Sequence, residues 1–300
     1  NSGSPAQPSA VRALPWRSHG PPLPELEQHP RRWRKISCAG THLDQPISSP
    51  RQRALDASFA RSFDLTRTAP APTLGERLDR LARLKAAVSD NDSRFEQAIP
   101  ADFGHRCPTE TANAETLLVL GEIKHAAKHL KKWMAPQRVS TALQFMPARN
   151  RLMPQPLGVV GIIAPWNYPL QLTLAPAVGA LAAGNRVMIK PSELVPRFSA
   201  LLQQVIAAKF DATEIFVTGI DDDIARSFAS LPFDHLIFTG STRVGRLIAE
   251  AAGRHLTPVP PARGGNSPAN VHRSAHPRPP AARPALRHPP TPGPAPHRPP

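Results

Sequence analysis

The chain has 300 residues, with 38 prolines and a formal net charge of +15, and this length suffices for one large domain or two ordinary ones. The excess positive charge lies at the ends: residues 1–53 carry a net +5 and residues 260–300 a net +6, whereas residues 54–259 carry +4. A domain built for nucleic acid gathers its basic residues on one folded face, so this distribution argues against a specific nucleic-acid partner.

The first segment, residues 1–53, is rich in Pro, Ser and Arg and has no helical or strand periodicity. We predict a disordered or non-native leader there. No basic start is followed by an apolar run, so a secretory signal is not predicted and a cytoplasmic protein is expected. The two cysteines, Cys38 and Cys107, are too few for a disulfide framework or a thiolate metal site.

Two amphipathic helices are predicted next in the chain. Thr73 and Glu76 form a capping box, in which each side chain accepts from the free backbone N–H of the other residue. The following residues place one apolar stripe at helical spacing: Leu74, Leu78, Leu81, Leu84 and Val88. A second helix is predicted over residues 110–134, with its acidic residues early and Lys131 and Lys132 late, as suits the helix dipole.

From residue 158 the pattern changes to short apolar runs that alternate with helices. Four buried strands are predicted, at residues 158–163, 186–190, 214–219 and 235–240. Helices are predicted between and after them, at residues 170–183, 196–210, 221–230 and 242–253. Strands without polar alternation, separated by helices, indicate an α/β fold with a doubly wound parallel sheet. Such a sheet binds its ligands at the carboxyl ends of the strands.

The stretch between Arg151 and Arg186 contains no formal charge, and its length alone would admit a transmembrane helix. Five prolines interrupt it, however, and proline breaks a helix because it lacks the backbone donor. We therefore predict a buried strand, loop and helix there, and no membrane partner.

The last segment, residues 260–300, contains 14 prolines and six arginines but no Asp, Glu, Phe, Trp or Tyr. Such a composition offers few core-forming side chains and few backbone donors. We predict that this Pro/Arg-rich tail is disordered and forms neither helix nor sheet. The folded domain would then comprise residues 54–259.

Two short polar motifs follow the first two predicted strands. In PWNYPL (165–170), Asn167 is a neutral donor that can stabilise a developing oxyanion. In KPSE (190–193), Lys190 can donate to a ribose hydroxyl and Glu193 can accept from one. The Glu193 carboxylate should also repel a 2′-phosphate, which favours NAD over NADP.

A third motif, FTGSTRVG (238–245), follows the last predicted strand. Gly240 allows a tight turn, and Ser241 can cap the next helix, whose free N–H groups favour a phosphate. Each of the three motifs alone is also compatible with a plain turn or helix cap. Their combination, in this order and after strands, is much more specific.

With these motifs, residues 54–259 resemble the aldehyde dehydrogenase superfamily. The segments most similar to its bacterial coniferyl aldehyde dehydrogenase branch are ADFGHR (101–106), HLKKWM (129–134), QPLGVVGIIAPWNYPLQL (155–172) and LPFDHLIFTGST (231–242). The resemblance implies a Rossmann-like NAD-binding domain and oxidation of an aldehyde, such as coniferyl aldehyde, to its acid. It implies NAD as the cofactor, with NADP possible, and a homodimer for the intact protein.

The resemblance also implies individual roles. Asn167 would donate to the thiohemiacetal oxyanion, and Trp166 would line the path between cofactor and substrate. Lys190 and Glu193 would hold the adenosine ribose, while Gly240 and Ser241 would approach the pyrophosphate. The full cofactor-binding set carried over is Ala164, Pro165, Trp166, Asn167, Lys190, Ser192, Glu193, Gly240, Ser241 and Gly245.

The family reaction needs two further residues, a nucleophilic cysteine and a general-base glutamate. The glutamate belongs two residues before the pair Gly264-Gly265, where this chain has Ala262. The cysteine position falls near Pro296, and no cysteine follows Cys107. We therefore expect that the catalytic domain is missing and that the chain is inactive as written.

Two origins fit this ending: a reading-frame shift, which would place residues 260–300 out of frame, or a purposeful truncation. An alternative function also remains open. The chain could be a non-catalytic NAD-binding or interaction fragment that keeps only the cofactor domain.

Overall fold

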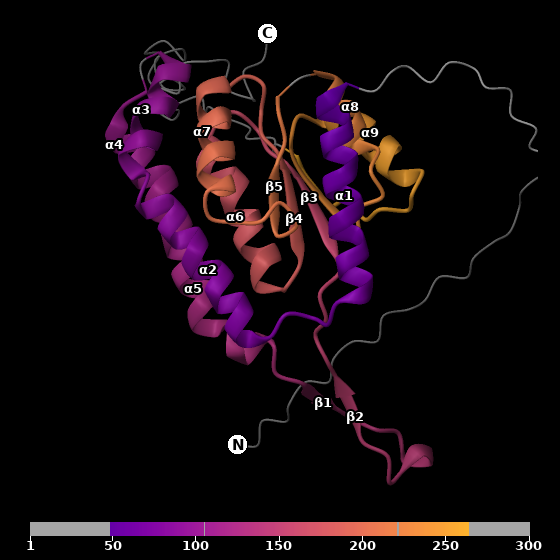
Figure 1. Ribbon diagram of the computed structural model, residues 1–300. Helices are drawn as coiled ribbons and strands as arrows, with labels where there is room; N and C mark the ends of the chain where they lie inside the picture. Colours follow the sequence, from indigo (N-terminus) through magenta and orange to yellow (C-terminus); the bar gives the residue numbers. More distant parts are fainter. Residues whose placement is uncertain (1–48, 105, 221, 264–300) are drawn as a thin grey trace, which may run out of the picture. The chain divides into compact units, whose positions relative to one another are not determined.

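The centre of the fold is a five-stranded parallel sheet (Figure 1). The computed structural model describes residues 49–104, 106–220 and 222–263. The strands are β3 (Val159–Ile163), β4 (Arg186–Lys190), β5 (Ile215–Val217), β6 (His235–Gly240) and β7 (Pro261–Arg263), in the order β5-β4-β3-β6-β7. From β3 the chain runs outward through β4 and β5, then returns to the other side of β3 with β6. This is the doubly wound order predicted from the sequence, with its switch point between β3 and β6.

Helices cover both faces of the sheet. The helices α6 (Pro169–Ala182) and α7 (Pro196–Ala207) lie on one face, and α1 (Pro50–Thr68), α8 (Asp222–Ala229) and α9 (Thr242–Gly253) lie on the other (Figure 1). Because successive strand residues point to opposite faces, Val160 and Ile162 pack into one core cluster and Val159 into the other. The inner strands β3 and β4 are buried on both sides, which explains their continuous apolar runs.

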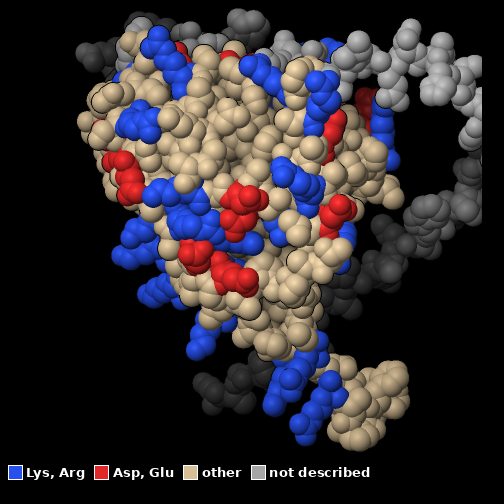
Figure 2. Space-filling view, in the orientation of Figure 1, with Lys and Arg blue, Asp and Glu red and all other residues tan. Residues whose placement is uncertain are grey.

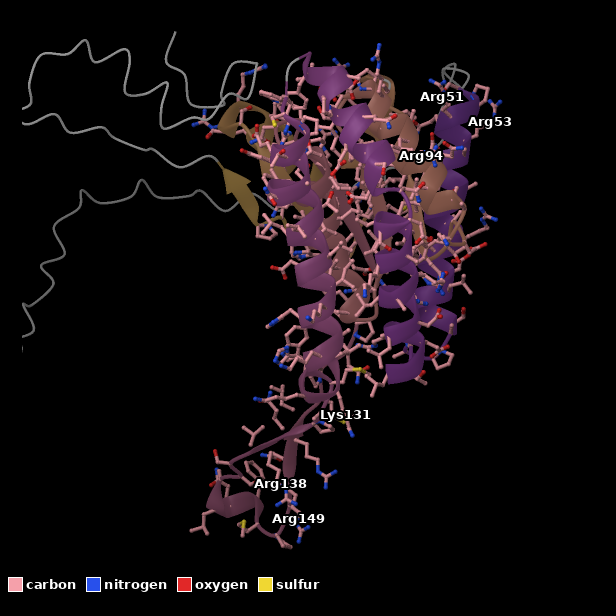
Figure 3. All side chains as sticks on the ribbon, turned by 90° about the vertical axis from the view of Figure 1, so that its left-hand side faces the viewer. Arg51, Arg53, Arg94, Lys131, Arg138 and Arg149 are labelled. Carbon is pink, nitrogen blue, oxygen red and sulfur yellow. The ribbon has the colours of Figure 1, made fainter. Side chains whose placement is uncertain are left out.

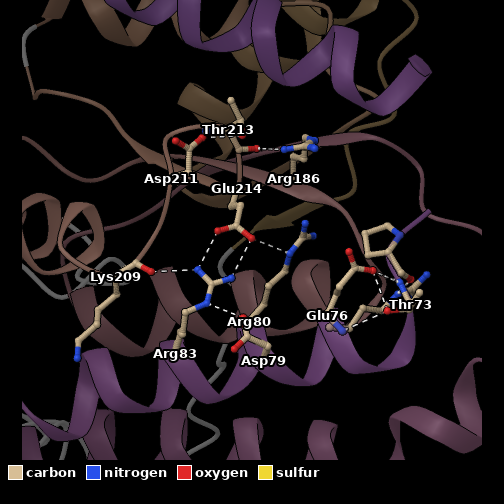
Figure 4. Close-up of polar contacts among 12 residues, drawn as sticks. Thr73, Glu76, Asp79, Arg80, Arg83, Arg186, Lys209, Asp211, Thr213 and Glu214 are labelled. Atoms are coloured by element: carbon tan, nitrogen blue, oxygen red, sulfur yellow. Dashed lines mark hydrogen bonds and ion pairs between the residues drawn. The ribbon is translucent and has the colours of Figure 1, made fainter. Parts of the chain in front are cut away.

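A further helical layer packs against α6 and α7. It consists of α2 (Leu74–Ser89), α3 (Asp92–Phe103) and α5 (Leu117–Trp133), of which α3 was not predicted. The predicted capping box of α2 is present: Thr73 Oγ1 accepts from the N–H of Glu76 at 3.3 Å, and Glu76 Oε2 accepts from the N–H of Thr73 at 2.7 Å (Figure 4).

The helix predicted over residues 110–134 is confirmed in extent but is not one regular α-helix. It comprises α4 (Pro108–Thr111), a π-helix over Ala112–Thr116 and then α5. A π-helical stretch closes wider turns than an α-helix, so it changes the direction of the side chains it carries. Apolar periodicity does not reveal such a stretch, because its five residues are too short to show a period.

A cluster of arginines on α2 joins this outer layer to the start of β5 (Figure 4). Arg83 makes a bidentate pair with Glu214, with Nη1 2.8 Å from Oε2 and Nη2 2.9 Å from Oε1. Arg80 Nε also donates to Glu214 Oε1, at 3.0 Å. One carboxylate therefore holds two turns of α2 against the edge of the sheet.

The structure corrects both predicted boundaries of the folded domain. At the start, α1 begins at Pro50 rather than after residue 53, because Ser49 caps the helix and a proline suits its first position. At the end, β7 lies inside the segment predicted to form neither helix nor sheet, and its backbone pairs in parallel with β6. A proline is tolerated at the first residue of an edge strand, where Pro261 stands. Residues 264–300 lie outside the described residues, as do residues 1–48.

An antiparallel hairpin that was not predicted extends from the end of α5. Its strands are β1 (Gln137–Val139) and β2 (Asn150–Leu152), and all six of their residues are exposed. Arg138 and Arg149 lie on this hairpin, away from the helices that carry Arg94 and Lys131 (Figure 3). Over the body of the domain acidic and basic side chains are interspersed, whereas the hairpin carries basic side chains and no acidic ones (Figure 2).

The uncharged stretch between Arg151 and Arg186 folds as the predicted strand, loop and helix, namely β3, the following turn and α6. Nowhere in the described part of the chain does a helix combine the length and the apolar character needed to cross a membrane.

Candidate functional site at the carboxyl edge of the sheet

The three motifs predicted to act together follow three neighbouring strands. Since β3 lies between β4 and β6, the segments that begin at Ala164, Pro191 and Ser241 leave the same edge of the sheet. The first two segments are joined directly, because the N–H of Ala164 donates to the carbonyl of Lys190 at 3.0 Å. The topology therefore brings together three segments that begin up to 77 residues apart in the chain.

The KPSE motif forms an ion pair at the end of β4. The Lys190 side chain is buried and its Nζ lies 2.5 Å from Glu193 Oε2, while the Glu193 side chain remains 47% exposed. Burial alone would raise the pKa of Glu193, but the hydrogen bond and the charge of Lys190, with a backbone hydrogen bond, hold the pKa below its usual value. Glu193 is therefore a carboxylate at neutral pH and keeps accessible oxygen for a ligand.

Ser192 stabilises the turn between this pair and α7. Its Oγ accepts from the N–H of Leu194 at 3.3 Å, and its carbonyl accepts from Ser199 Oγ at 3.1 Å. Both bonds hold the turn, so the geometry gives Ser192 a structural task whether or not it touches a cofactor.

The third motif forms the start of α9. Ser241 caps this helix by accepting from the N–H of Val244 at 3.4 Å, which leaves the N–H groups of the first two helical residues for an anion. The reason for glycine at position 240 differs from the one predicted. A Cβ there would come within 2.6 Å of the Phe238 ring, so close packing, and not a left-handed turn, requires glycine.

Asn167 lies in the turn between β3 and α6, and its backbone is held by a residue that the sequence had not singled out. Arg106 Nη1 donates to the carbonyl oxygen of Asn167 at 3.0 Å. Arg106 in turn lies 2.9 Å from the carboxylate of Glu115, and both side chains are fully buried. No periodic signal in the sequence marks this pair, because Arg106 lies in the loop before α4 and Glu115 in the short π-helix.

Residue 262, the position predicted for the general base, falls in β7, where the backbone of Ala262 lies in register with Thr239 of β6. The backbone of Ala262 thus lies near the carboxyl end of β6, and β6 separates it from β3. Of the two cysteines, Cys38 lies outside the described residues, and Cys107 is exposed at the start of α4. Among residues 49–263 as described, no group of three or more His, Cys, Asp and Glu side chains could hold a metal ion.

A cavity of about 270 Å³ lies at the end of β5, between the first turns of α1 and α7. Its polar lining comes from Arg51, Ser199, Gln203 and Thr218. Lys190, Glu193 and Ser241 do not line this cavity. These motif residues therefore lie outside this cavity.

A doubly wound parallel sheet, with a capped helix terminus and an accessible carboxylate at the carboxyl ends of its inner strands, defines the nucleotide-binding class of α/β domains. The comparison with known families is more specific. A model of the aldehyde dehydrogenase family matches residues 51–282, and the chain belongs to this family.

Among curated relatives, a probable coniferyl aldehyde dehydrogenase of Pseudomonas aeruginosa is 44% identical over 220 residues, which cover 73% of this chain and 46% of the relative. Among solved structures, the substrate-bound state of Staphylococcus aureus AldH is similar with a TM-score of 0.69 and 36% identity, covering 71% of this chain and 46% of that one. An NAD+ complex of an aldehyde dehydrogenase from Bacillus cereus has the same fold, with a TM-score of 0.64 at 21% identity. The chain spans about half the length of the curated relatives it matches.

Proposed function

We propose that this chain supplies the NAD-binding half of an aldehyde dehydrogenase that oxidises an aromatic aldehyde, of the coniferyl type, to its carboxylic acid. One observation carries the proposal: three motifs from distant parts of the sequence meet at the carboxyl ends of β4, β3 and β6. The identity to a probable coniferyl aldehyde dehydrogenase supports the aromatic substrate.

The residues of the chain fit the cofactor by their donor and acceptor chemistry. The Lys190 ammonium has three N–H donors, and one of them donates to Glu193, so the others remain for a ribose hydroxyl. Glu193 in turn can accept a hydrogen bond from a ribose hydroxyl. The start of α9, capped by Ser241, receives the pyrophosphate. Bound NAD supplies the hydride acceptor, and the amide of Asn167 donates to the oxyanion that develops on the substrate.

Calorimetric titration of the 300-residue chain with NAD tests the binding half of this proposal. We expect saturable binding that is lost in Lys190→Met, which keeps the length of the side chain but removes its donors. Lys124→Met, an exposed change on α5, is the matched control and should bind as the unchanged chain does. A chain that folds but shows no heat with NAD would overturn the proposal.

We further propose that the 300-residue chain does not turn over. Ala262 offers no carboxylate to activate water, and the cysteines at positions 38 and 107 both precede the sheet that carries the site. Incubation with NAD and coniferyl aldehyde should yield no NADH absorbance, and Ala262→Glu should not restore it because the nucleophile is still lacking. NADH production by the unchanged chain would contradict this.

For the intact enzyme we propose a cytoplasmic homodimer. The proposal rests on the family resemblance, and the light-scattering mass of a complete relative of this chain, purified from a soluble extract, would test it.

A further inference from the structure

A buried pair of opposite charges lies beneath the turn that carries Asn167. Arg106 precedes α4 and Glu115 belongs to the π-helix, and the side chain of each is 0% exposed. Arg106 Nη2 lies 2.9 Å from Glu115 Oε1. Removing two charges from water is costly, so a buried ion pair is weak evidence for a gain in stability.

Arg106 contacts two residues of the Trp166-Asn167-Tyr168 turn directly. It is linked to the third, Trp166, through the ring of Phe103. Its Nη1 donates to the carbonyl of Asn167 at 3.0 Å, and its guanidinium lies over the Tyr168 ring, 4.8 Å from the centroid. The guanidinium also lies over the Phe103 ring, 5.1 Å from its centroid, and this ring lies 5.9 Å from that of Trp166. A planar guanidinium can donate and stack at once, which a lysine cannot do.

Glu115 holds the other end of the same turn by capping α6. Its Oε2 accepts from the N–H of Leu170 at 2.6 Å and from the N–H of Gln171 at 3.2 Å. These are among the first N–H groups of α6, which have no partner within the helix. A carboxylate there is also favoured by the positive end of the helix dipole.

We propose that Arg106 and Glu115 are positioning residues that fix Asn167 at the carboxyl end of β3. Arg106 holds the backbone of Asn167, Glu115 holds the start of α6 three residues later, and the ion pair links the two anchors. The π-helix places Glu115 where its two oxygens can meet Arg106 and α6. This inference rests on the oxyanion role proposed for Asn167, but the anchoring itself does not depend on that role.

The pair also makes the turn sensitive to pH. Burial raises the pKa of Glu115 to about 7, although Arg106 and the N–H groups of Gln171 and Leu170 favour the carboxylate. Besides Arg106, the charged or titratable groups that face Glu115 are Glu110 of α4, which favours protonation, and Tyr168 of the turn. Protonation of Glu115 below neutral pH removes its charge from Arg106 and weakens the cap, so the turn should loosen as the pH falls.

Amide hydrogen exchange, followed by mass spectrometry of peptides from the full 300-residue chain, tests this anchoring. Glu115→Gln and Arg106→Lys each keep most of the buried volume, whereas Glu122→Gln, an exposed change on α5, is the matched control. At pH 8 we expect exchange in the peptide spanning residues 164–172 to speed up at least tenfold in both variants. Exchange in α2 and α7 should stay unchanged, and the control should match the unchanged chain throughout.

A second readout follows the pH dependence. Relative to the intrinsic exchange rate, protection of the 164–172 peptide should fall between pH 8 and pH 6 in the unchanged chain and stay constant in Glu115→Gln. Unchanged exchange of this peptide in both variants would overturn the inference. So would equal acceleration in α2 and α7, because the pair would then serve only global stability. Failure of the chain to bind NAD would contradict the proposed function, but the exchange result would still test whether Arg106 and Glu115 anchor the turn.

Discussion

At the scale of single residues, Gly158 shows how the sheet is started. Its φ of +138° is a conformation that L side chains rarely adopt, and a Cβ there would collide with the Asp234 carboxylate. That carboxylate accepts from the N–H of Val159 at 2.7 Å and from Arg67 Nη2 at 2.5 Å. Glycine at this position therefore allows one aspartate to join the start of β3 to the end of α1.

We expect Gly158→Ala to lower the free energy of unfolding by about 2–4 kcal/mol, because it adds backbone strain and displaces a hydrogen-bonded carboxylate. Urea unfolding measures the loss. Gly121→Ala is the control: it lies in the middle of α5 with open space around the new methyl group, and should stabilise by about 0.5–1 kcal/mol. Equal stability of the two variants would show that Asp234 can move freely.

Glu193 is the residue that should set the choice between NAD and NADP. Its carboxylate is charged at neutral pH and half exposed, so it repels a 2′-phosphate. In Glu193→Gln we expect the ratio of the NADP to the NAD dissociation constant to fall about tenfold, which corresponds to about 1.4 kcal/mol. Calorimetry with each cofactor measures the ratio. Glu250→Gln, on the exposed side of α9, should leave it unchanged, and an unchanged ratio in both variants would exclude the carboxylate as the discriminator.

At the scale of elements, α2 is held to the start of β5 by Glu214. Burial raises the pKa of this carboxyl, but the hydrogen bond and charge of Arg83, with those of Arg80, outweigh burial and hold the pKa below its usual value. A carboxyl whose pKa is depressed by folding stabilises the protein above its unfolded pKa of about 4.3. This stability is lost as the pH falls through the lower folded value.

We expect Glu214→Gln to cost about 1–3 kcal/mol of unfolding free energy at pH 7, since it removes the carboxylate charge that the buried Arg80 and the partly buried Arg83 share. The difference from the unchanged chain should shrink as the pH falls from 5 to 3, because the native carboxyl is then protonated too. Urea titrations across this range measure it, with Glu122→Gln on the exposed face of α5 as control. A constant difference at every pH would mean that packing, and not charge, makes the contribution.

The sequence predicted those elements whose signals are local or periodic. The strands around Val160 and Ile189 were found because both faces are buried, and α2 was found because Thr73 and Glu76 cap it. By contrast, α1 was missed, since only Leu55 and Phe59 among its apolar residues are buried, and three-residue β7 was missed because it depends on pairing with β6. Periodicity carries no information on pairing partners.

The residues of the candidate site likewise fall into those that could be predicted from the sequence and those that could not. The placement of Lys190 and Ser241 at the carboxyl edge of the sheet was predictable, since Lys190 ends β4 and Ser241 follows β6 directly. Arg106 and Glu115 were not, because they lie 61 and 55 residues before the backbone groups they bind. Contacts of that range depend on how α5 packs against α6, which the chain's local pattern does not encode.

At the scale of the whole molecule, the β1–β2 hairpin exposes an apolar surface that its own domain does not cover. Leu143 is 85% exposed and Phe145 63%, and Met146, Leu152 and Met153 are each more than half exposed. Contiguous apolar patches of this kind mark surfaces that meet another chain or another part of the same protein. The chain spans about half the length of its curated relatives. Residues exposed in this chain can therefore be covered, in a longer relative, by the part of the protein that this chain does not match.

We therefore expect the 300-residue chain to self-associate through the hairpin as its concentration rises. The double variant Leu143→Ser with Phe145→Ser removes the two large apolar side chains at the tip without touching a strand pair, so it should shift the chain toward monomer. Sedimentation velocity over a hundredfold range of concentration measures the shift. The matched control is Leu117→Ser with Leu118→Ser, which removes two exposed leucines at the start of α5. If that control reduces association as much as the hairpin variant does, general apolar stickiness is the cause; if only the hairpin variant does, the hairpin is the interface.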